Sequence, residues 1–471
     1  MLHSGIFVPM KKQRIIIVGG GAAGFFAAIT AAAEASPGVQ VTLLERGAQC
    51  LSKVRISGGG RCNVTHLMFD SRELARRYPR GEQALIGAFK RFQASDTVAW
   101  FEARGVKLKV ESDGRMFPVT DSSETIVNSL LNAAKSAGVS VRTNCGVDSV
   151  RKVKPAPQEI TEKEQLGASV CRIRKHQSRV IPLSEPLYPP LSPVCLVRNS
   201  YSAELSEQGF ELVLTSGEKI SCEKLLLATG GCRAAASGQL AAALGHTIES
   251  PVPSLFTFHI ALPWLRELAG VSIESAEVSV PGAGLRERGP VLLTHWGLSG
   301  PAVLRASAWG ARELHKRDYN FQLHVNWLPQ LTSELLLKEI TSRRQGQGAK
   351  LMVNAPIAPL TARLWEALVL AAGLSRETRW ASLTRAQQHQ LIQQLTHTEI
   401  AVTGKSLNKD EFVTCGGVEL DEVNFKTMES RVCPGLYFAG ELLDIDGITG
   451  GFNFQAAWTT GWIAGNAMAA S

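Results

Sequence analysis

The first strongly patterned segment is residues 14–18, RIIIV, in which four apolar residues follow one another without a polar break. Such continuity is typical of a strand in a parallel sheet that is covered on both faces. Three glycines follow, and small apolar residues from about 22 to 35 predict a helix that ends before Pro37-Gly38. A second strand is predicted over 39–44. The pattern therefore predicts a complete βαβ unit.

A long proline-rich stretch interrupts this regularity. Seven prolines lie between Val150 and Phe210. Prolines at this density oppose helices and strands, and ordered loops of such length are uncommon. Residues 151–207 are therefore predicted to be a mobile insertion. Apolar runs at 210–214 and 225–229 then predict two further strands.

The middle of the chain has two different patterns. Short β-like runs punctuated by proline and glycine fill 251–314 and predict a β-rich unit. Apolar residues at helical spacing fill 332–396 and predict a small helical module. The end of the chain has the same order of elements as the start. It predicts a strand at 435–440, a Gly- and Asp-rich loop and a helix at 454–470.

This return predicts an α/β fold in which both ends of the chain build one discontinuous Rossmann-type domain. An inserted β-rich domain and the helical module separate its two parts. The expected boundaries are 1–250 for the N-terminal part, 251–403 for the insert and 404–471 for the C-terminal part.

Composition narrows the class of protein. Of 471 residues, 45% are hydrophobic and 20% are charged, which is ordinary for a globular protein. We expect a cytoplasmic protein, because neither a signal-like apolar run nor a membrane-length segment stands out. The nine cysteines form no CxxC pair, so we expect free thiols and no metal site.

The formal charge of +8 permits an acidic partner, and residues 151–180 supply part of it. No aromatic residues interleave with this basic run. Nucleic acid is therefore the minor alternative among partners.

The six residues from Gly19 to Gly24 fit GxGxxG, with a strand before them and a helix after them. Gly19 permits a tight turn, Gly21 lets a pyrophosphate approach the backbone, and Gly24 lets the helix pack on the strand. Glu45 lies 21 positions after Gly24 and is expected to accept hydrogen bonds from ribose hydroxyls. The same dinucleotide site is expected to include Ala22, Ala23 and Arg46. This pattern alone does not separate FAD from NAD.

Seven further segments decide between these cofactors, because together they resemble the BaiN/YhiN-like flavoproteins, also described as aminoacetone-oxidase-like FAD-binding proteins. They occur in the family's order and span nearly the whole chain outside the first dozen residues and the insertion. They are KVRISGGGRCNVT at 53–65, GRMFP at 114–118, LLATGG at 226–231, THWGLSGP at 294–301, TCGGV at 414–418, TMES at 427–430 and LYFAGELLDIDGITGGFN at 436–453.

The resemblance implies that the cofactor is FAD. It also implies an FAD domain of N- and C-terminal parts, a β-rich insert and a helical module. One departure is His66, where the family usually has asparagine; another is the turn at 232–238.

Cationic and glycine-rich residues of the early loop are expected beside the flavin. Lys53 and Arg61 carry charges that suit a pyrophosphate, and Gly59 lies between them. The resemblance places Cys62 and Asn63 close to the isoalloxazine. A packing role for Cys62 is favoured over a redox role, because no resolving cysteine is adjacent.

Other expected contacts lie on strand ends. Similar flavoproteins pair a valine backbone with adenine, which suggests Val147, although this residue can equally belong to the core. Glu441 follows Gly440 at the end of an apolar strand and is expected to bind ribityl hydroxyls. The glycine pair Gly450-Gly451 opens the last helix, whose positive end suits a reduced flavin. Three more residues complete the expected set: Gly230, Asp444 and Asn453.

No catalytic acid or base can be identified from the sequence; His295 and Arg115 are the substrate-side candidates. We expect an FAD-dependent oxidoreductase that transfers hydride through flavin N5 to or from a small organic substrate. Amine oxidation and C=C or C=O reduction both remain open, with NAD(P)H as a transient reductant. The alternatives are an RNA-modifying flavoprotein and a non-enzymatic flavin-binding protein. The substrate, the electron acceptor and the oligomeric state are left open.

Overall fold

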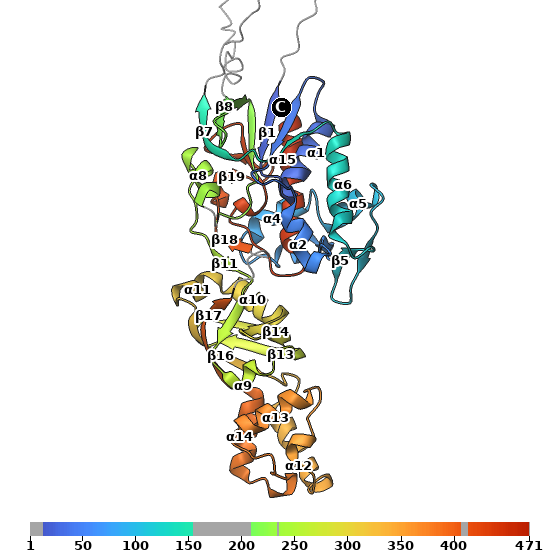
Figure 1. The fold of residues 1–471 in the computed structure, drawn as a ribbon, viewed down its shortest axis with the longest axis vertical. Helices are drawn as coiled ribbons and strands as arrows, with labels where there is room; N and C mark the ends of the chain where they lie inside the picture. Colours follow the sequence, from blue (N-terminus) through green and yellow to red (C-terminus); the bar gives the residue numbers. More distant parts are fainter. Residues whose placement is uncertain (1–12, 154–208, 233–234, 407–412, 471) are drawn as a thin grey trace, which may run out of the picture.

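The computed structural model describes residues 13–153, 209–232, 235–406 and 413–470. Three parts follow one another along the long axis (Figure 1): an α/β part, a β-barrel and a helical module. The predicted α/β class with a β-rich and a helical insert is confirmed. The predicted mobile insertion at 151–207 and its basic run lie almost entirely outside the described residues.

The main sheet joins the two ends of the chain. Its strand order is β19-β20-β21-β10-β1-β2-β6. Strand β1 (Arg14–Val18) lies parallel between β2 (Gln40–Leu44) and β10 (Lys224–Leu227), and β10 pairs in parallel with the late strand β21 (Leu436–Phe438). The other members are β6 (Ser140–Arg142), β19 (Val423–Asn424) and β20 (Glu429–Ser430). The predicted return of the C-terminal segment to the first sheet is therefore confirmed.

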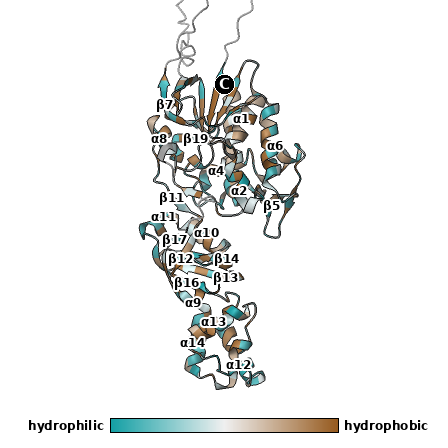
Figure 2. Ribbon diagram, viewed as in Figure 1, coloured by the Kyte–Doolittle hydropathy of each residue, from teal (hydrophilic) through white to brown (hydrophobic). Residues whose placement is uncertain are grey.

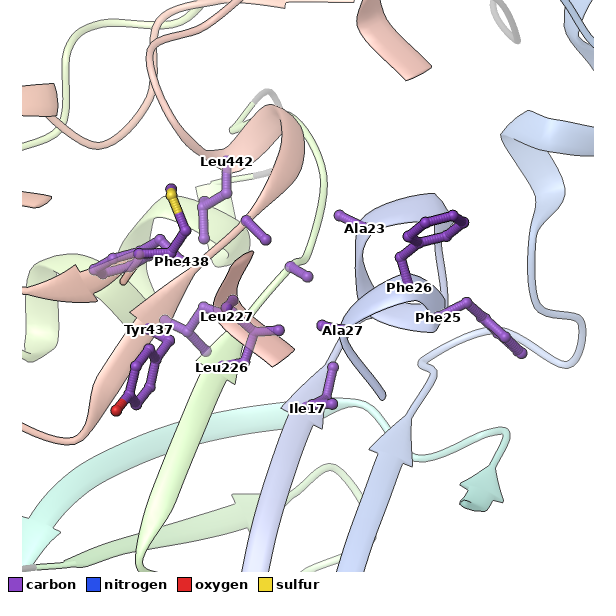
Figure 3. Packing of buried hydrophobic residues seen from close by; sticks show 14 of the residues in the cluster. Ile17, Ala23, Phe25, Phe26, Ala27, Leu226, Leu227, Tyr437, Phe438 and Leu442 are labelled. Carbon is purple, nitrogen blue, oxygen red and sulfur yellow. The ribbon is translucent and has the colours of Figure 1, made fainter. Parts of the chain in front are cut away.

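Helices α1 (Ala22–Glu34) and α15 (Phe452–Ala469) pack together because glycines let their backbones approach. A Cβ added to Gly461 would lie 2.5 Å from the carbonyl oxygen of Ala23, and one added to Gly465 would lie 2.7 Å from that of Ala27. Figure 3 shows side chains of α1 gathered with those of β1, β10 and β21 in one core. In Figure 2 the strands of this sheet are coloured as hydrophobic.

Smaller elements surround this core. They are α2 (Ser52–Gly60), α3 (Ser71–Ala75), α4 (Glu82–Phe89), α5 (Ala94–Glu102), α6 (Ser123–Ser136) and α8 (Ala235–Ala243), the sheet of β3 (Thr65–His66), β5 (Arg115–Pro118) and β4 (Leu108–Val110), and the sheet of β7 (Val147–Val153), β8 (Gly209–Leu214) and β9 (Lys219–Cys222).

The middle part is a closed antiparallel barrel. Its strands, in order around the barrel, are β12 (Thr257–Ile260), β15 (Gly297–Ser299), β14 (Leu285–Leu293), β13 (Ser272–Val280), β16 (Asn320–Asn326) and β17 (Thr398–Ser406). A short ribbon of β11 (Val252–Ser254) and β18 (Val413–Cys415) links it to the α/β part.

The expectation of β-like structure through 314 needs one correction. Helices α10 (Pro301–Trp309) and α11 (Ala311–Lys316) occupy the end of that segment. Proline is well suited to the first turn of a helix, where its missing N–H has no intrahelical partner. The Gly300-Pro301 pair therefore starts a helix where its composition suggested a turn.

The helical module consists of α12 (Ser333–Gly346), α13 (Ala362–Ala371) and α14 (Arg385–Thr396), and α9 (Pro263–Arg266) lies beside it (Figure 1). Its core contains fully buried tryptophans: Trp365 donates from Nε1 to the Met352 carbonyl at 2.6 Å and stacks on Trp380. Across the described residues, every helix is too short or too polar to cross a bilayer.

Candidate functional site

The first turn of the βαβ unit has the geometry that its glycines predict. Gly19 has φ +116°, and an added Cβ would lie 2.2 Å from the Ala228 carbonyl oxygen of the adjacent strand end. A Cβ on Gly24 would lie 1.9 Å from the Gly19 carbonyl oxygen. Next to Gly21, by contrast, no described atom lies within 4 Å of an added Cβ. The turn is thus closely packed on two sides and open at Gly21.

Glu45 is held at the end of β2 by backbone donors. Its carboxylate accepts from Gly20 N at 2.8 Å and from Gly47 N at 2.7 Å. The Cys145 amide donates to the Glu45 carbonyl at 2.8 Å, and Gly146 packs against the side chain of Arg46, so the start of β7 at Val147 lies at this same end. Gly20 was missing from the predicted set, although it lies inside the glycine triplet.

The early cationic segment begins as a helix, which corrects the expectation of a loop at Lys53. The helical turns of α2 end at Ser57, and Gly58 and Gly59 take left-handed backbone angles. Next to Gly59 and Gly60, no described atom lies within 4 Å of an added Cβ. The glycine turn therefore offers a bare backbone surface.

Cys62 follows this turn and is fully buried, with φ +61°. Burial raises the pKa of its thiol to about 12, so the thiol stays protonated at neutral pH. A protonated thiol is a poor nucleophile, which agrees with a packing role.

Asn63 joins the early segment to the late one. With its amide oriented to satisfy both neighbours, Nδ2 donates to the Thr65 carbonyl at 3.0 Å and Oδ1 accepts from Gly451 N at 2.9 Å. A Cβ on Gly451, whose φ is +90°, would lie 2.7 Å from the Thr65 carbonyl oxygen. The glycine at the start of α15 therefore permits this close junction.

Glu441 lies on the strand-end side of the same site. Its Oε2 pairs with Lys53 Nζ at 2.5 Å, and its Oε1 accepts from Thr414 N at 2.9 Å. A Cβ on Gly231 would meet both the Thr414 hydroxyl oxygen and Glu441, whereas beside Gly230 no described atom lies within 4 Å. Thr414 and Gly231 were not predicted, and both lie within the motifs that carried the resemblance.

The acidic residues of the late loop bind the barrel side. Asp444 accepts from Gly416 N at 2.9 Å and pairs with Arg312 at 3.2 Å. Asp446 is completely buried and makes a two-pronged ion pair with Arg80. Burial is the main cause that raises the pKa of Asp446, to about 6, against the opposing effect of Arg80. Asn453 closes the loop by bonding the Gly447 backbone at 2.8 and 2.9 Å.

The remaining candidates lie in two different places. Arg61 and Arg115 share Glu111, at 2.6 and 3.0 Å, and both lie over the Phe117 ring, next to the glycine turn. His295 lies in the β14–β15 turn, and its carbonyl accepts from Arg266 of α9 at 2.8 Å. That turn is at the end of the barrel nearer the helical module, so the structure does not bring His295 together with the other predicted residues.

We call the residues gathered at the carboxyl end of the main sheet the glycine site: 19–24, Glu45, Lys53, 58–63, Gly230, Gly231, Glu441 and 450–451. Two helices start here, α1 after Gly21 and α15 after Gly451, and these glycine N-caps have no side chain to bond the first helical N–H groups. Neither has an acidic residue in its first turn. The first turn of such a helix supplies N–H groups and partial positive charge, which suit an anion, although at α15 the Gly451 N–H is already bonded to Asn63.

These features fit FAD. The positions beside Gly21, Gly59 and Gly230 are open to added atoms, and the carboxylates of Glu45 and Glu441 can accept from sugar-like hydroxyls. The α1 start would hold the pyrophosphate, and the α15 start would lie at the isoalloxazine end. The predicted convergence of an early glycine turn and a late glycine-led helix is therefore present.

Comparisons with known proteins point to one family. The model for the HI0933-like protein Rossmann domain matches residues 13–172, and the model for the HI0933-like protein barrel and H2TH domain matches residues 252–413. A ribosomal RNA dihydrouridine synthase of Escherichia coli is 29% identical over 442 residues, covering 92% of each chain. A 3-dehydro-bile acid delta(4,6)-reductase of Clostridium scindens is 25% identical over 447 residues, covering 93% of this chain and 95% of the relative.

Among solved structures, a 3-ketosteroid-delta4-(5alpha)-dehydrogenase of Rhodococcus jostii matches with a TM-score of 0.46 and 13% identity, covering 99% of each chain.

Proposed function

Because this chain belongs to the HI0933-like family, we propose that it is an FAD-dependent oxidoreductase that reduces a C=C bond conjugated to a carbonyl group. The observation that carries the proposal is the glycine site, where two helix starts with glycine N-caps and two carboxylates border an open backbone surface. This arrangement suits a ligand with a central diphosphate and hydroxylated arms on either side.

The names of the relatives favour reduction over amine oxidation. Dihydrouridine differs from uridine by two hydrogens across one C=C bond beside a carbonyl, and a delta(4,6)-reductase also acts on C=C bonds. In each case one carbon takes a hydride and its neighbour takes a proton. NAD(P)H supplies the two electrons in this proposal, docking transiently.

The residues of this chain have separate tasks in binding. Glu45 would accept from the adenosine ribose, the backbone N–H groups at the α1 start would bind the diphosphate, and Glu441 would accept from the ribityl chain. Lys53 would share its charge between Glu441 and the diphosphate. Bound FAD supplies hydride transfer at N5. The α15 start would stabilise negative charge on the reduced ring.

A spectroscopic titration tests this proposal. The purified protein should show a flavin spectrum that NADPH or NADH bleaches without oxygen and that an α,β-unsaturated ketone or uridine restores. Mass spectrometry should find the substrate two hydrogens heavier. A protein that neither contains nor gains flavin contradicts the cofactor. A flavin bleached by simple amines, but not restored by any conjugated C=C substrate, contradicts the reaction.

A uridine in ribosomal RNA is the second candidate substrate, and one observation favours it over a free small molecule. Residues 330–397 carry eight basic and four acidic side chains, an excess of four positive charges. The basic residues are Lys338, Arg343, Arg344, Lys350, Arg363, Arg376, Arg379 and Arg385, against Glu334, Glu339, Glu366 and Glu377. An excess of positive charge favours binding to the phosphates of RNA.

The two substrates can be separated by charge. Lys338, Arg344 and Lys350 are exposed on or beside α12. Replacing all three with glutamate should weaken binding of ribosomal RNA fragments and lower the slope of log K against log salt by about one per lost phosphate contact. Reduction of a small conjugated ketone should stay unchanged in this variant. RNA binding that ignores the substitutions excludes this surface.

A further inference from the structure

A cluster of potential metal ligands lies on the barrel, away from the glycine site. His324 is in β16, and its cross-strand partner in β17 is Glu399. His397 is the C-cap residue of α14, two residues before Glu399, and its side chain lies beside those of His324 and Glu399. The inward residues of these strands, such as Leu323, Val325 and Ile400, are fully buried in the barrel core. The three polar side chains therefore project from the outer face.

The donor atoms are already close. One ligand atom from each of His324, His397 and Glu399 lies within 4.8 Å of the other two. The two imidazole centroids are 4.0 Å apart, and His397 Nε2 lies 3.9 Å from Glu399 Oε1. Donors of a tetrahedral zinc ion lie roughly 3.4 Å apart, given bonds of about 2.0–2.1 Å. Small side-chain rotations suffice to close this gap.

Apart from the members of this cluster, no described residue bonds the ring nitrogens of the two histidines. Within the described residues, neither ring makes a hydrogen bond, although they lie half-buried at van der Waals distance from each other. Two adjacent imidazoles without hydrogen-bond partners among the described residues are suited to binding a shared metal ion.

A pocket opens beside these rings. Its lining includes His324, Thr396 and His397 together with Ser279, Glu277 and Arg286. Glu277 is paired with Arg286 at 3.5 Å, so its charge is partly neutralised. The pocket leaves room for water at a fourth ligand position.

We propose that His324, His397 and Glu399 bind one zinc ion, with water completing a tetrahedral site. Two imidazoles and a carboxylate match the donors that zinc takes in proteins. His397 directly follows α14, whereas His324 and Glu399 belong to barrel strands (Figure 1). The ion therefore ties the end of the helical module to the barrel. This proposal is independent of the flavin chemistry.

Calorimetric titration of metal-depleted, flavin-loaded full-length protein with zinc chloride tests the site. The wild type should bind about one equivalent, and His324→Ala and His397→Ala should each weaken binding by at least about tenfold. His389→Ala is the matched control, because His389 is exposed on α14 outside the cluster. It should bind as the wild type does. Zinc should also raise the urea midpoint of the wild type and leave that of His397→Ala unchanged.

Cobalt gives a second readout on unaltered protein, since tetrahedral cobalt with nitrogen and oxygen ligands has a distinctive visible spectrum. If His324→Ala fails to fold, Glu399→Gln at the exposed third ligand provides the comparison. Equal zinc binding by the wild type and by the cluster variants would overturn the proposal, as would binding lost equally in His389→Ala.

Discussion

The glycine site and the core of the helical module solve opposite packing problems. At the glycine site side chains are absent where a ligand needs the backbone, so Gly21, Gly59 and Gly230 border open positions. In the helical module, by contrast, the large side chains of Trp365 and Trp380 are fully buried in the interior. The contrast indicates that different parts of this chain provide stability and ligand access. Substitutions in one part should therefore change the free energy of unfolding, and substitutions in the other should change FAD binding.

Removing a large side chain from the module should have the largest effect on stability. Trp365→Ala leaves a cavity and removes one of the two hydrogen bonds of the Met352 carbonyl, so we expect a loss of about 3–5 kcal/mol in the free energy of unfolding. Urea denaturation followed by circular dichroism measures it. Trp296→Ala is the control, because that ring is 58% exposed. Flavin content at low temperature should stay unchanged in both variants. Loss of flavin from folded Trp365→Ala would show that the two regions are coupled.

Adding a side chain at the glycine site should weaken FAD binding and leave stability unchanged. Gly21 has φ −90° and ψ −170°, angles that valine adopts readily, and its Cβ position is open. Gly21→Val should therefore fold normally but weaken FAD binding about a hundredfold, which is about 2.7 kcal/mol. Equilibrium dialysis with FAD measures the change.

Gly87→Ala is the matched control for this substitution, since Gly87 is an exposed helical position with an equally open Cβ site. It should bind FAD as the wild type does. Unaltered FAD binding by Gly21→Val would remove the glycine site as the cofactor site.

The buried Arg80–Asp446 pair, which lies in the α/β part outside both regions, should give a pH-dependent effect of intermediate size. The pKa of Asp446 is raised to about 6 by burial. A raised folded-state pKa means that this carboxyl's contribution to stability is complete below its unfolded pKa, near 4, and is lost as pH rises through about 6. The wild type should therefore lose stability relative to Asp446→Asn between about pH 4 and 6. Urea midpoints of both proteins across this range test the sign; a constant difference contradicts it.

The smallest expected effect concerns the half-exposed pair at the glycine site. Lys53 Nζ lies 2.5 Å from Glu441, and the lysine side chain is 53% exposed. Because exposed ion pairs are screened by water, Lys53→Met should change the unfolding free energy by about 0–1 kcal/mol. FAD binding should weaken several-fold and become less sensitive to salt. Salt sensitivity equal to that of the wild type would show that Lys53 does not contact the diphosphate.

Local signals predicted the residues of the first turn well, because a strand, a glycine run and a helix over 14–35 form within one segment. Glu45 could be placed because it ends the next strand. The junction of Asn63 with Gly451, and that of Arg80 with Asp446, join segments more than three hundred positions apart. Their side-chain contacts leave no periodic trace in the sequence.

The same limit explains the placement of His295. The motif around His295 identified the family but could not predict that the barrel closes. Closure of the barrel places the turn that carries His295 beside α9. The prediction of no metal site also rested on local cysteine spacing, whereas the cluster at His324 depends on the pairing of β16 with β17.

The contact of α15 with α1 has a consequence for biosynthesis. Helix α15 begins at Phe452, which is 418 positions after α1 ends at Glu34. Until α15 has been synthesised, the backbone of Ala23 and Ala27 lacks the helix that packs on it. We therefore expect cofactor loading to follow the synthesis of α15, and nascent chains that stall before this helix should lack flavin colour.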